Sequence, residues 1–125
     1  MSTKPLALII EDDEDHNMVF MTALTKAGYT TESVFDGVTA LNRLTKIKPA
    51  VIILDLHMPG INGGLLLREI RKDPRTTSSF VIIVTADAEF AARLQSHADL
   101  TLIKPVSFSE LTQLATRLLD KPETI

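Results

Sequence analysis

The chain has 125 residues, of which 45% are hydrophobic, and this suits one compact domain with its own core. Its formal net charge of −3 gives no general attraction to nucleic acids or anionic lipids, so we expect no direct contact with nucleic acid and none with a membrane. The absence of cysteine excludes disulfides, thiolate metal sites and cysteine nucleophiles.

The first elements follow from the hydrophobic pattern. The apolar run over residues 6–10 predicts a buried strand. Apolar residues three to four positions apart then predict an amphipathic helix, which Gly28 ends in the C-terminal position that glycine favours. This stripe consists of Val19, Phe20, Ala23, Leu24 and Ala27.

The same alternation of strand and helix continues to the end of the chain. Further strands are predicted at residues 30–35, 51–54, 80–84 and 100–103. Helices are predicted from Val38 to before Pro49, over 65–71 after a break at Gly63–Gly64, around Phe90 and Leu94, and after the capping-box spacing at Ser107 and Glu110.

This (βα)₅ order predicts an α/β fold, a doubly wound parallel sheet of five strands with helices on both faces. In such sheets, ligands bind beyond the carboxyl ends of the strands. Four polar clusters follow the predicted strands and therefore converge at one edge of the sheet: Glu11–Asp12, Asp55, Thr85 and Lys104.

The carboxylates at this edge favour a divalent cation. Two carboxylates 4 Å apart repel by about 4 kcal/mol at an effective dielectric constant near 20. Protonation of one group or a bound cation removes this repulsion. Mg²⁺ or Mn²⁺ suits an all-oxygen set, with Asp12 and Asp55 as direct ligands and Glu11 acting through a bound water.

Residues 13–15 are also acidic, and we interpret them as the start of the first helix, where acids interact favourably with the helix dipole. His16 follows them at the top of that helix. We interpret it as a surface or capping residue and not as a metal ligand.

Beside such a cation, Asp55 has the surroundings of a phosphoryl acceptor, because carboxylates form aspartyl-phosphates. Thr85 can donate a hydrogen bond to a phosphoryl oxygen, and Lys104 can face it with a positive charge. Ala86 is small enough to leave room for the group. Each residue alone is unremarkable, and their convergence predicts the site.

The pattern resembles the receiver domain of two-component response regulators over essentially the whole chain. The matching motifs are the acids at 11–13, "LDLHMPGINGG" around Asp55, "VTA" at 84–86 and "IKP" at 103–105. The resemblance implies a flavodoxin-like three-layer sandwich with strand order 2-1-3-4-5. It also implies that Asp55 accepts a phosphoryl group from a histidine kinase in a step that depends on Mg²⁺.

The resemblance assigns roles to further residues. The backbone carbonyl of His57 would be a third metal contact, and the Lys104–Pro105 bond would be cis. The side chains of His57 and Asp87 would modulate the lifetime of the phosphoryl group. Thr101 stands where the family usually has an aromatic switch residue, which leaves the output of the signal open.

The resemblance also defines the expected partners. The donor would be a histidine kinase or a phosphotransfer protein, and the target a downstream protein or a fused output domain, with a homodimer allowed. We expect a cytoplasmic signalling domain that shifts its conformation and does not turn over a substrate. It would occupy residues 1–125, with an ordered core at about 5–120.

Other functions fit the sequence less well. An FMN carrier would need a Ser/Thr-rich loop where the acids stand, and an aspartate-nucleophile phosphatase would have a second aspartate in place of His57. The glycine fingerprints of Rossmann and P-loop proteins are missing. A degenerate receiver that docks partners without phosphorylation is the remaining alternative. Thr101 slightly favours it, and the complete acceptor set argues against it.

Overall fold

Five parallel strands form the central sheet of the computed structural model, which describes residues 4–120. The strands lie in the order β2-β1-β3-β4-β5, as predicted. Residues 1–3 and 121–125 of the predicted domain lie outside the described part. The strands are β1 Leu6–Ile10, β2 Thr30–Val34, β3 Val51–Leu54, β4 Phe80–Thr85 and β5 Leu100–Ile103.

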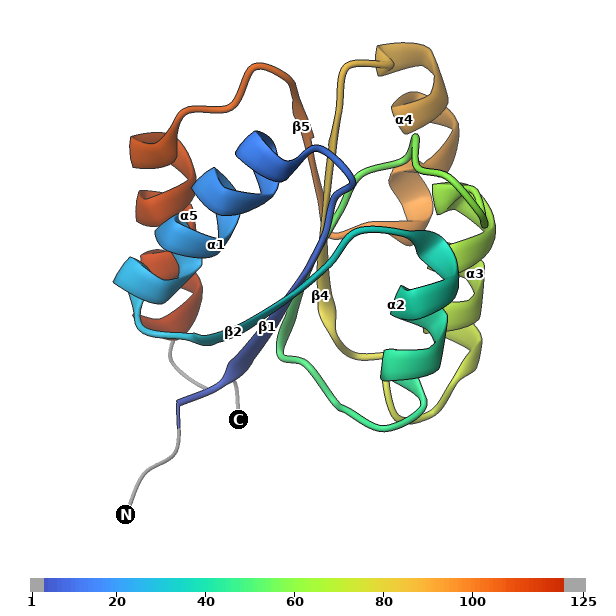
Figure 1. Cartoon of the computed structure of the whole chain (residues 1–125), viewed down its shortest axis with the longest axis horizontal. Coiled ribbons are helices and arrows are strands. Elements are labelled where there is room, and N and C mark those ends of the chain that lie inside the picture. The colour runs from blue at the N-terminus through green and yellow to red at the C-terminus, as the bar shows by residue number, and fades with distance from the viewer. Residues whose placement is uncertain (1–3, 121–125) are drawn as a thin grey trace.

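Helices cover both faces of this sheet (Figure 1). α1 and α5 lie on one face, and α2, α3 and α4 lie on the other, which makes the predicted three-layer sandwich. None of the helices within residues 4–120 is long and apolar enough to cross a membrane. The helices are α1 Glu14–Ala27, α2 Gly37–Leu44, α3 Gly63–Lys72, α4 Ala88–Leu94 and α5 Phe108–Asp120, with a short 3₁₀ helix η1 at Gln95–His97.

The strands bury both of their faces. In β1, Leu8 and Ile10 pack with the α2–α4 layer, whereas Ala7 and Ile9 pack with α1 and α5. Every residue of β3 is buried, as expected of a parallel strand covered on both sides. This packing fixes the carboxyl ends of the strands, and the residues that follow them are therefore held at one edge of the molecule.

The ends of α1 follow from local chemistry. Asp13 is the N-cap residue, and its Oδ1 accepts the backbone N–H of His16 at 2.9 Å. Glu14 and Asp15 occupy the first turn, as predicted for acids at a helix start. Gly28 ends the helix with φ 119°, a left-handed conformation that glycine adopts without strain.

The predicted break at Gly63–Gly64 is wrong, because α3 begins at this pair. Asn62 caps the helix, and its Oδ1 accepts the backbone N–H of Leu65 at 3.0 Å. Glycine is needed at 63 because a Cβ there would lie 2.6 Å from the Cα of Leu56. Gly63 therefore allows α3 to start directly against the segment that follows β3.

One residue of the predicted apolar stripe of α1 lies at the edge of the core, since Val19 is 36% exposed. In α1 the buried face instead includes Asn17, Phe20 and Leu24. Because successive helical residues are rotated by about 100°, Val19 lies beside this face and not on it. The apolar pattern thus predicted the helix correctly but placed the edge of its buried face one residue off.

Candidate functional site

Three carboxylates meet where β1 and β3 end. Glu11 and Asp12 follow β1, and Asp55 follows β3, the strand paired with it. The backbone N–H of Asp55 donates to the carbonyl of Ile10 at 2.9 Å, so the pairing continues past the last strand residue. Each side chain offers one oxygen, and these atoms lie within 4.8 Å of one another. Glu11 and Asp55 are buried, whereas Asp12 is exposed.

Lys104 brings one positive charge to these acids. Its backbone N–H donates to the carbonyl of Thr85 at 2.8 Å, which holds the β5–α5 connection beside β4. Its Nζ lies 2.8 Å from Glu11 Oε1 and 3.8 Å from Asp55 Oδ2. The Lys104–Pro105 peptide bond is cis, as the resemblance implied. One ammonium group therefore faces two buried carboxylates.

The electrostatics of the cluster are incompletely balanced. Burial raises the pKa of Glu11 to about 7, and the nearby Asp55 carboxylate acts in the same direction. The hydrogen bond from Lys104 opposes this shift by favouring the charged form of Glu11. Three acids share one lysine, and the cluster therefore retains an excess of negative charge that a cation can offset.

The donor set fits a hard divalent cation. All three side chains offer carboxylate oxygens, the ligands that Mg²⁺ prefers, and the exposed Asp12 leaves the cluster open to solvent. The backbone of His57 lies against the same cluster, since its N–H donates to Asp55 Oδ1 at 3.2 Å. The residues predicted around a metal are thus brought together.

A second group of residues links Thr85 to α4. Thr85 is buried, and its Oγ1 accepts the backbone N–H of Asp87 at 3.1 Å. Asp87 Oδ1 caps α4 by accepting the N–H of Phe90 at 2.9 Å, and this bond lowers the pKa of Asp87, as does its contact with His57. Asp87 Oδ2 lies 3.0 Å from His57 Nε2, and the His57 ring packs on Phe90 with centroids 5.5 Å apart.

The remaining predicted residues lie in the same loops or on the edge strand. Ala86 is exposed between Thr85 and Asp87, and Pro105 is exposed after Lys104. Thr101 is a partly buried residue of β5, in register with Ile83 of β4.

The model of the response regulator receiver domain matches residues 7–116. The chain belongs to this family. Among curated proteins, it is 30% identical over 124 residues to the DNA-binding dual master transcriptional regulator RpaA of Synechocystis sp., covering 97% of this chain and 52% of RpaA. The receiver thus spans about half the length of the first relatives that it matches.

Solved structures show the same fold. The chemotaxis response regulator CheY4 of Vibrio cholerae shares the fold with a TM-score of 0.84 at 24% identity, over 93% of this chain and 99% of CheY4. The receiver domain of the sensor histidine kinase PA1611 from Pseudomonas aeruginosa PAO1 has a TM-score of 0.83 at 26% identity, over 95% of this chain and 100% of that domain. That structure contains a magnesium ion coordinated in its active-site cleft. Receiver domains are signalling modules that bind Mg²⁺ at an acidic pocket, and this receiver has such a cluster.

Two receiver residues near the acids were not predicted from sequence. Asn17 is buried in α1, and its Nδ2 donates to the carbonyls of Glu11 at 2.9 Å and Val34 at 3.2 Å, which holds the turn after β1. Its position three residues before Phe20 on the apolar face was an available signal. His16 contacts Lys104 at 3.1 Å, and no local pattern indicates this contact across 88 positions.

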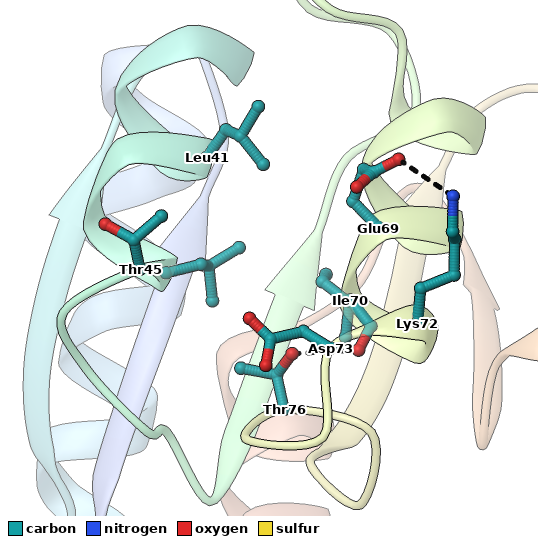
Figure 2. A pocket seen from close by; sticks show the side chains of 8 residues that line it. Leu41, Thr45, Glu69, Ile70, Lys72, Asp73 and Thr76 are labelled. Atoms are coloured by element: carbon teal, nitrogen blue, oxygen red, sulfur yellow. Dashed lines mark hydrogen bonds and ion pairs between the residues drawn. The ribbon is translucent and has the colours of Figure 1, made fainter.

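A hollow of about 270 Å³ lies between α2 and α3, away from the receiver's acid cluster (Figure 2). Its walls include Leu41 from α2 and Ile70 from α3, and Glu69 and Lys72 form an ion pair at 3.9 Å on its rim. None of the predicted site residues lines it. The shape of the surface alone therefore does not locate the chemistry, which depends on the converging strand ends.

Proposed function

We propose that Asp55 accepts a phosphoryl group from a histidine kinase or phosphotransfer protein in a step that depends on Mg²⁺. The observation that carries the proposal is the meeting of three carboxylates within 4.8 Å, with the Lys104 ammonium 3.8 Å from Asp55. Glu11, Asp12, Asp55 and the backbone carbonyl of His57 would hold the metal. When bound, Mg²⁺ would neutralise negative charge on the acceptor and on the phosphoryl oxygens.

The transfer needs only a nucleophile and groups that stabilise charge. An Asp55 carboxylate oxygen forms a bond to phosphorus as the bond to the donor's histidine nitrogen breaks, and the electron pair stays on that nitrogen. Lys104 donates from its ammonium group to a phosphoryl oxygen. Thr85 Oγ1 already accepts from Asp87, so its own O–H is free to donate to another phosphoryl oxygen.

The signal would be a change in partner affinity, and not turnover of a substrate. A two-state domain responds to phosphorylation when the new group favours one state. Movement of Thr85 toward the phosphoryl group would pull on Asp87, which caps α4 and contacts His57. We infer that this linkage carries the signal to α4, because Thr101 replaces the aromatic side chain expected on β5. The target would be a downstream protein or a fused output domain.

Intact mass after incubation with acetyl phosphate tests the acceptor. The wild type and Asp55→Asn are compared, each with Mg²⁺ and with a chelator. We expect one phosphoryl adduct that needs both Mg²⁺ and Asp55. An adduct that persists in Asp55→Asn would place the acceptor elsewhere. No adduct, together with no heat of Mg²⁺ binding in a calorimetric titration, would contradict the proposal and favour the phosphorylation-independent docking module.

A further inference from the structure

The ammonium group of Lys104 contacts three side chains from three parts of the chain. Its Nζ lies 2.8 Å from Glu11 Oε1, 3.1 Å from His16 Nδ1 and 3.8 Å from Asp55 Oδ2. The first two distances are hydrogen bonds, and the third is too long for one. His16 is therefore a direct neighbour of the lysine, although it does not belong to the acid cluster.

The hydrogen-bonding inventory fixes the role of His16. An ammonium group has three N–H donors and no acceptor, so the Nδ1 atom of His16 must accept. The proton of the neutral ring then lies on Nε2. Two of the three Lys104 donors are occupied by Glu11 and His16. The third remains for the side of Asp55, where the longer gap leaves room for a bond to a phosphoryl oxygen.

The ring of His16 is itself held in place. It lies in the first turn of α1, where its backbone N–H donates to the Asp13 cap at 2.9 Å. It stacks on Phe20 with centroids 6.2 Å apart and planes at 29°, and Phe20 is buried in the core. The side chain of His16 is 49% exposed, whereas that of Lys104 is only 17% exposed. A ring anchored on one face by the core thus presents Nδ1 to a largely enclosed ammonium.

We propose that His16 is a positioning residue for phosphoryl transfer, which orients the Lys104 ammonium so that its free N–H faces the phosphoryl group on Asp55. The inference rests on the proposed function of Asp55 and adds a residue from α1 to it. Without the Nδ1 acceptor, only the bond to Glu11 holds the ammonium, which can then turn its other N–H groups toward water, and fewer molecules have the lysine aimed at Asp55.

Two substitutions separate positioning from packing. His16→Leu keeps an apolar side chain on Phe20 but removes the acceptor. His16→Asn places an amide oxygen close to the position of Nδ1 and so restores an acceptor. With acetyl phosphate and Mg²⁺, we expect His16→Leu to be phosphorylated roughly 2- to 10-fold more slowly, the range set by the net worth of one hydrogen bond. His16→Asn should load at nearly the wild-type rate. Urea unfolding of both variants checks that the fold is intact.

A second measurement follows proton exchange at the Lys104 ammonium and needs no phosphorylation. In ¹⁵N NMR of the protein without Mg²⁺, a held ammonium exchanges its protons slowly and gives a resolved Nζ signal. The Lys104 signal should be present in the wild type and in His16→Asn, and broadened or lost in His16→Leu. Lys104→Met assigns it.

The outcomes distinguish this inference from the proposed function. Equal loading rates in all three proteins, with an unchanged Lys104 signal, would overturn the role of His16 and leave Asp55 as the acceptor. An equal fall in both variants would also overturn it, because a merely structural role predicts no rescue by asparagine. Failure of the wild type to form any adduct, together with no heat of Mg²⁺ binding, would instead contradict the function of Asp55.

Discussion

Charged side chains are paired at one end of the sheet and unbalanced at the other. At the amino ends of the strands, Arg75 donates to the carbonyls of Leu44 at 2.8 Å and Ile47 at 2.7 Å, and also to that of Thr45. Leu44 is the last residue of α2 and Thr45 is its C-cap, so their carbonyls lie where a helix end leaves groups without helical partners, and Ile47 lies in the segment that follows. A single guanidinium therefore satisfies the end of a helix that has no glycine cap.

Arg71 works in the same way beside it. It donates to the carbonyls of Thr77, Ser79 and His97 at 2.8 to 2.9 Å, and pairs with Asp99 at 2.9 Å. Asp99 in turn accepts the backbone N–H of Val81 at 2.8 Å. The charged side chains at this end bond to backbone groups and form one ion pair, and these contacts hold the loops that lead into β4 and β5.

At the carboxyl ends of the strands the balance is different. Three carboxylates lie within 4.8 Å, and Lys104 is the cation that touches them. Paired charges hold the loops at one end of the sheet, whereas the acid cluster at the other end keeps an excess of negative charge. Substitutions at the amino ends of the strands should therefore lower mainly stability, and substitutions at the carboxyl ends should change mainly metal binding.

The largest effect on stability is expected from Arg75→Met. It removes donors to three carbonyls at and just after the end of α2, and we expect a loss of about 2–4 kcal/mol in the free energy of unfolding, since hydrogen bonds from charged groups are the stronger ones. Urea denaturation followed by circular dichroism measures the loss. Mg²⁺ affinity in the folded variant should stay at the wild-type value, and a large fall would show that the two ends are coupled.

Asn17→Leu changes a buried polar residue beside the acid cluster. The substitution removes the amide group that donates to the carbonyls of Glu11 and Val34. We expect about 1–3 kcal/mol of destabilisation, the cost of leaving a buried polar group unpaired. Because the turn that carries Glu11 loosens, calorimetry should also show weaker Mg²⁺ binding. Loss of stability with unchanged affinity would mean that Asn17 supports only the fold.

The smallest effect is expected at the surface pair of Glu32 and Arg43. The hydrogen bond from Arg43 holds the pKa of Glu32 below its ordinary value of 4.5. A lowered pKa gives stability that is present above 4.5 and is lost as pH falls through the folded-state pKa. The pair is partly exposed and screened, so Glu32→Gln should cost little at pH 7. Unfolding measured from pH 7 to pH 3 should show the gap to wild type closing, and a gap that widens in acid would contradict this cause.

Much of the fold is predictable because its signals are local. Each strand is a short apolar run, and acids at residues 13–15 and Gly28 mark the ends of α1. The strand order came from the family resemblance and is confirmed. The start of α3 was misplaced because the close approach of Gly63 to Leu56 is a tertiary contact.

The meeting of the acids was predictable for a related reason. Parallel strands bring their carboxyl ends to one edge, so residues directly after β1 and β3 had to lie near one another. The contacts of His16 with Lys104 and of His57 with Asp87 were not predictable in this way. They join positions 88 and 30 residues apart and depend on loop paths and side-chain rotamers, which no periodicity records.

The free energy of unfolding of the wild type and Asp55→Asn, measured in chelator and in saturating Mg²⁺, tests whether the excess negative charge makes the acid cluster a metal site. Asp55 faces two carboxylates within 4.8 Å and one ammonium at 3.8 Å, so removal of its charge relieves more repulsion than attraction. In chelator, we expect Asp55→Asn to be more stable than the wild type by roughly 1 kcal/mol. Mg²⁺ should stabilise the wild type far more than the variant, because binding to the folded state raises its stability. A variant that is less stable than the wild type in chelator, with the same gain from Mg²⁺ as the wild type, would contradict the account.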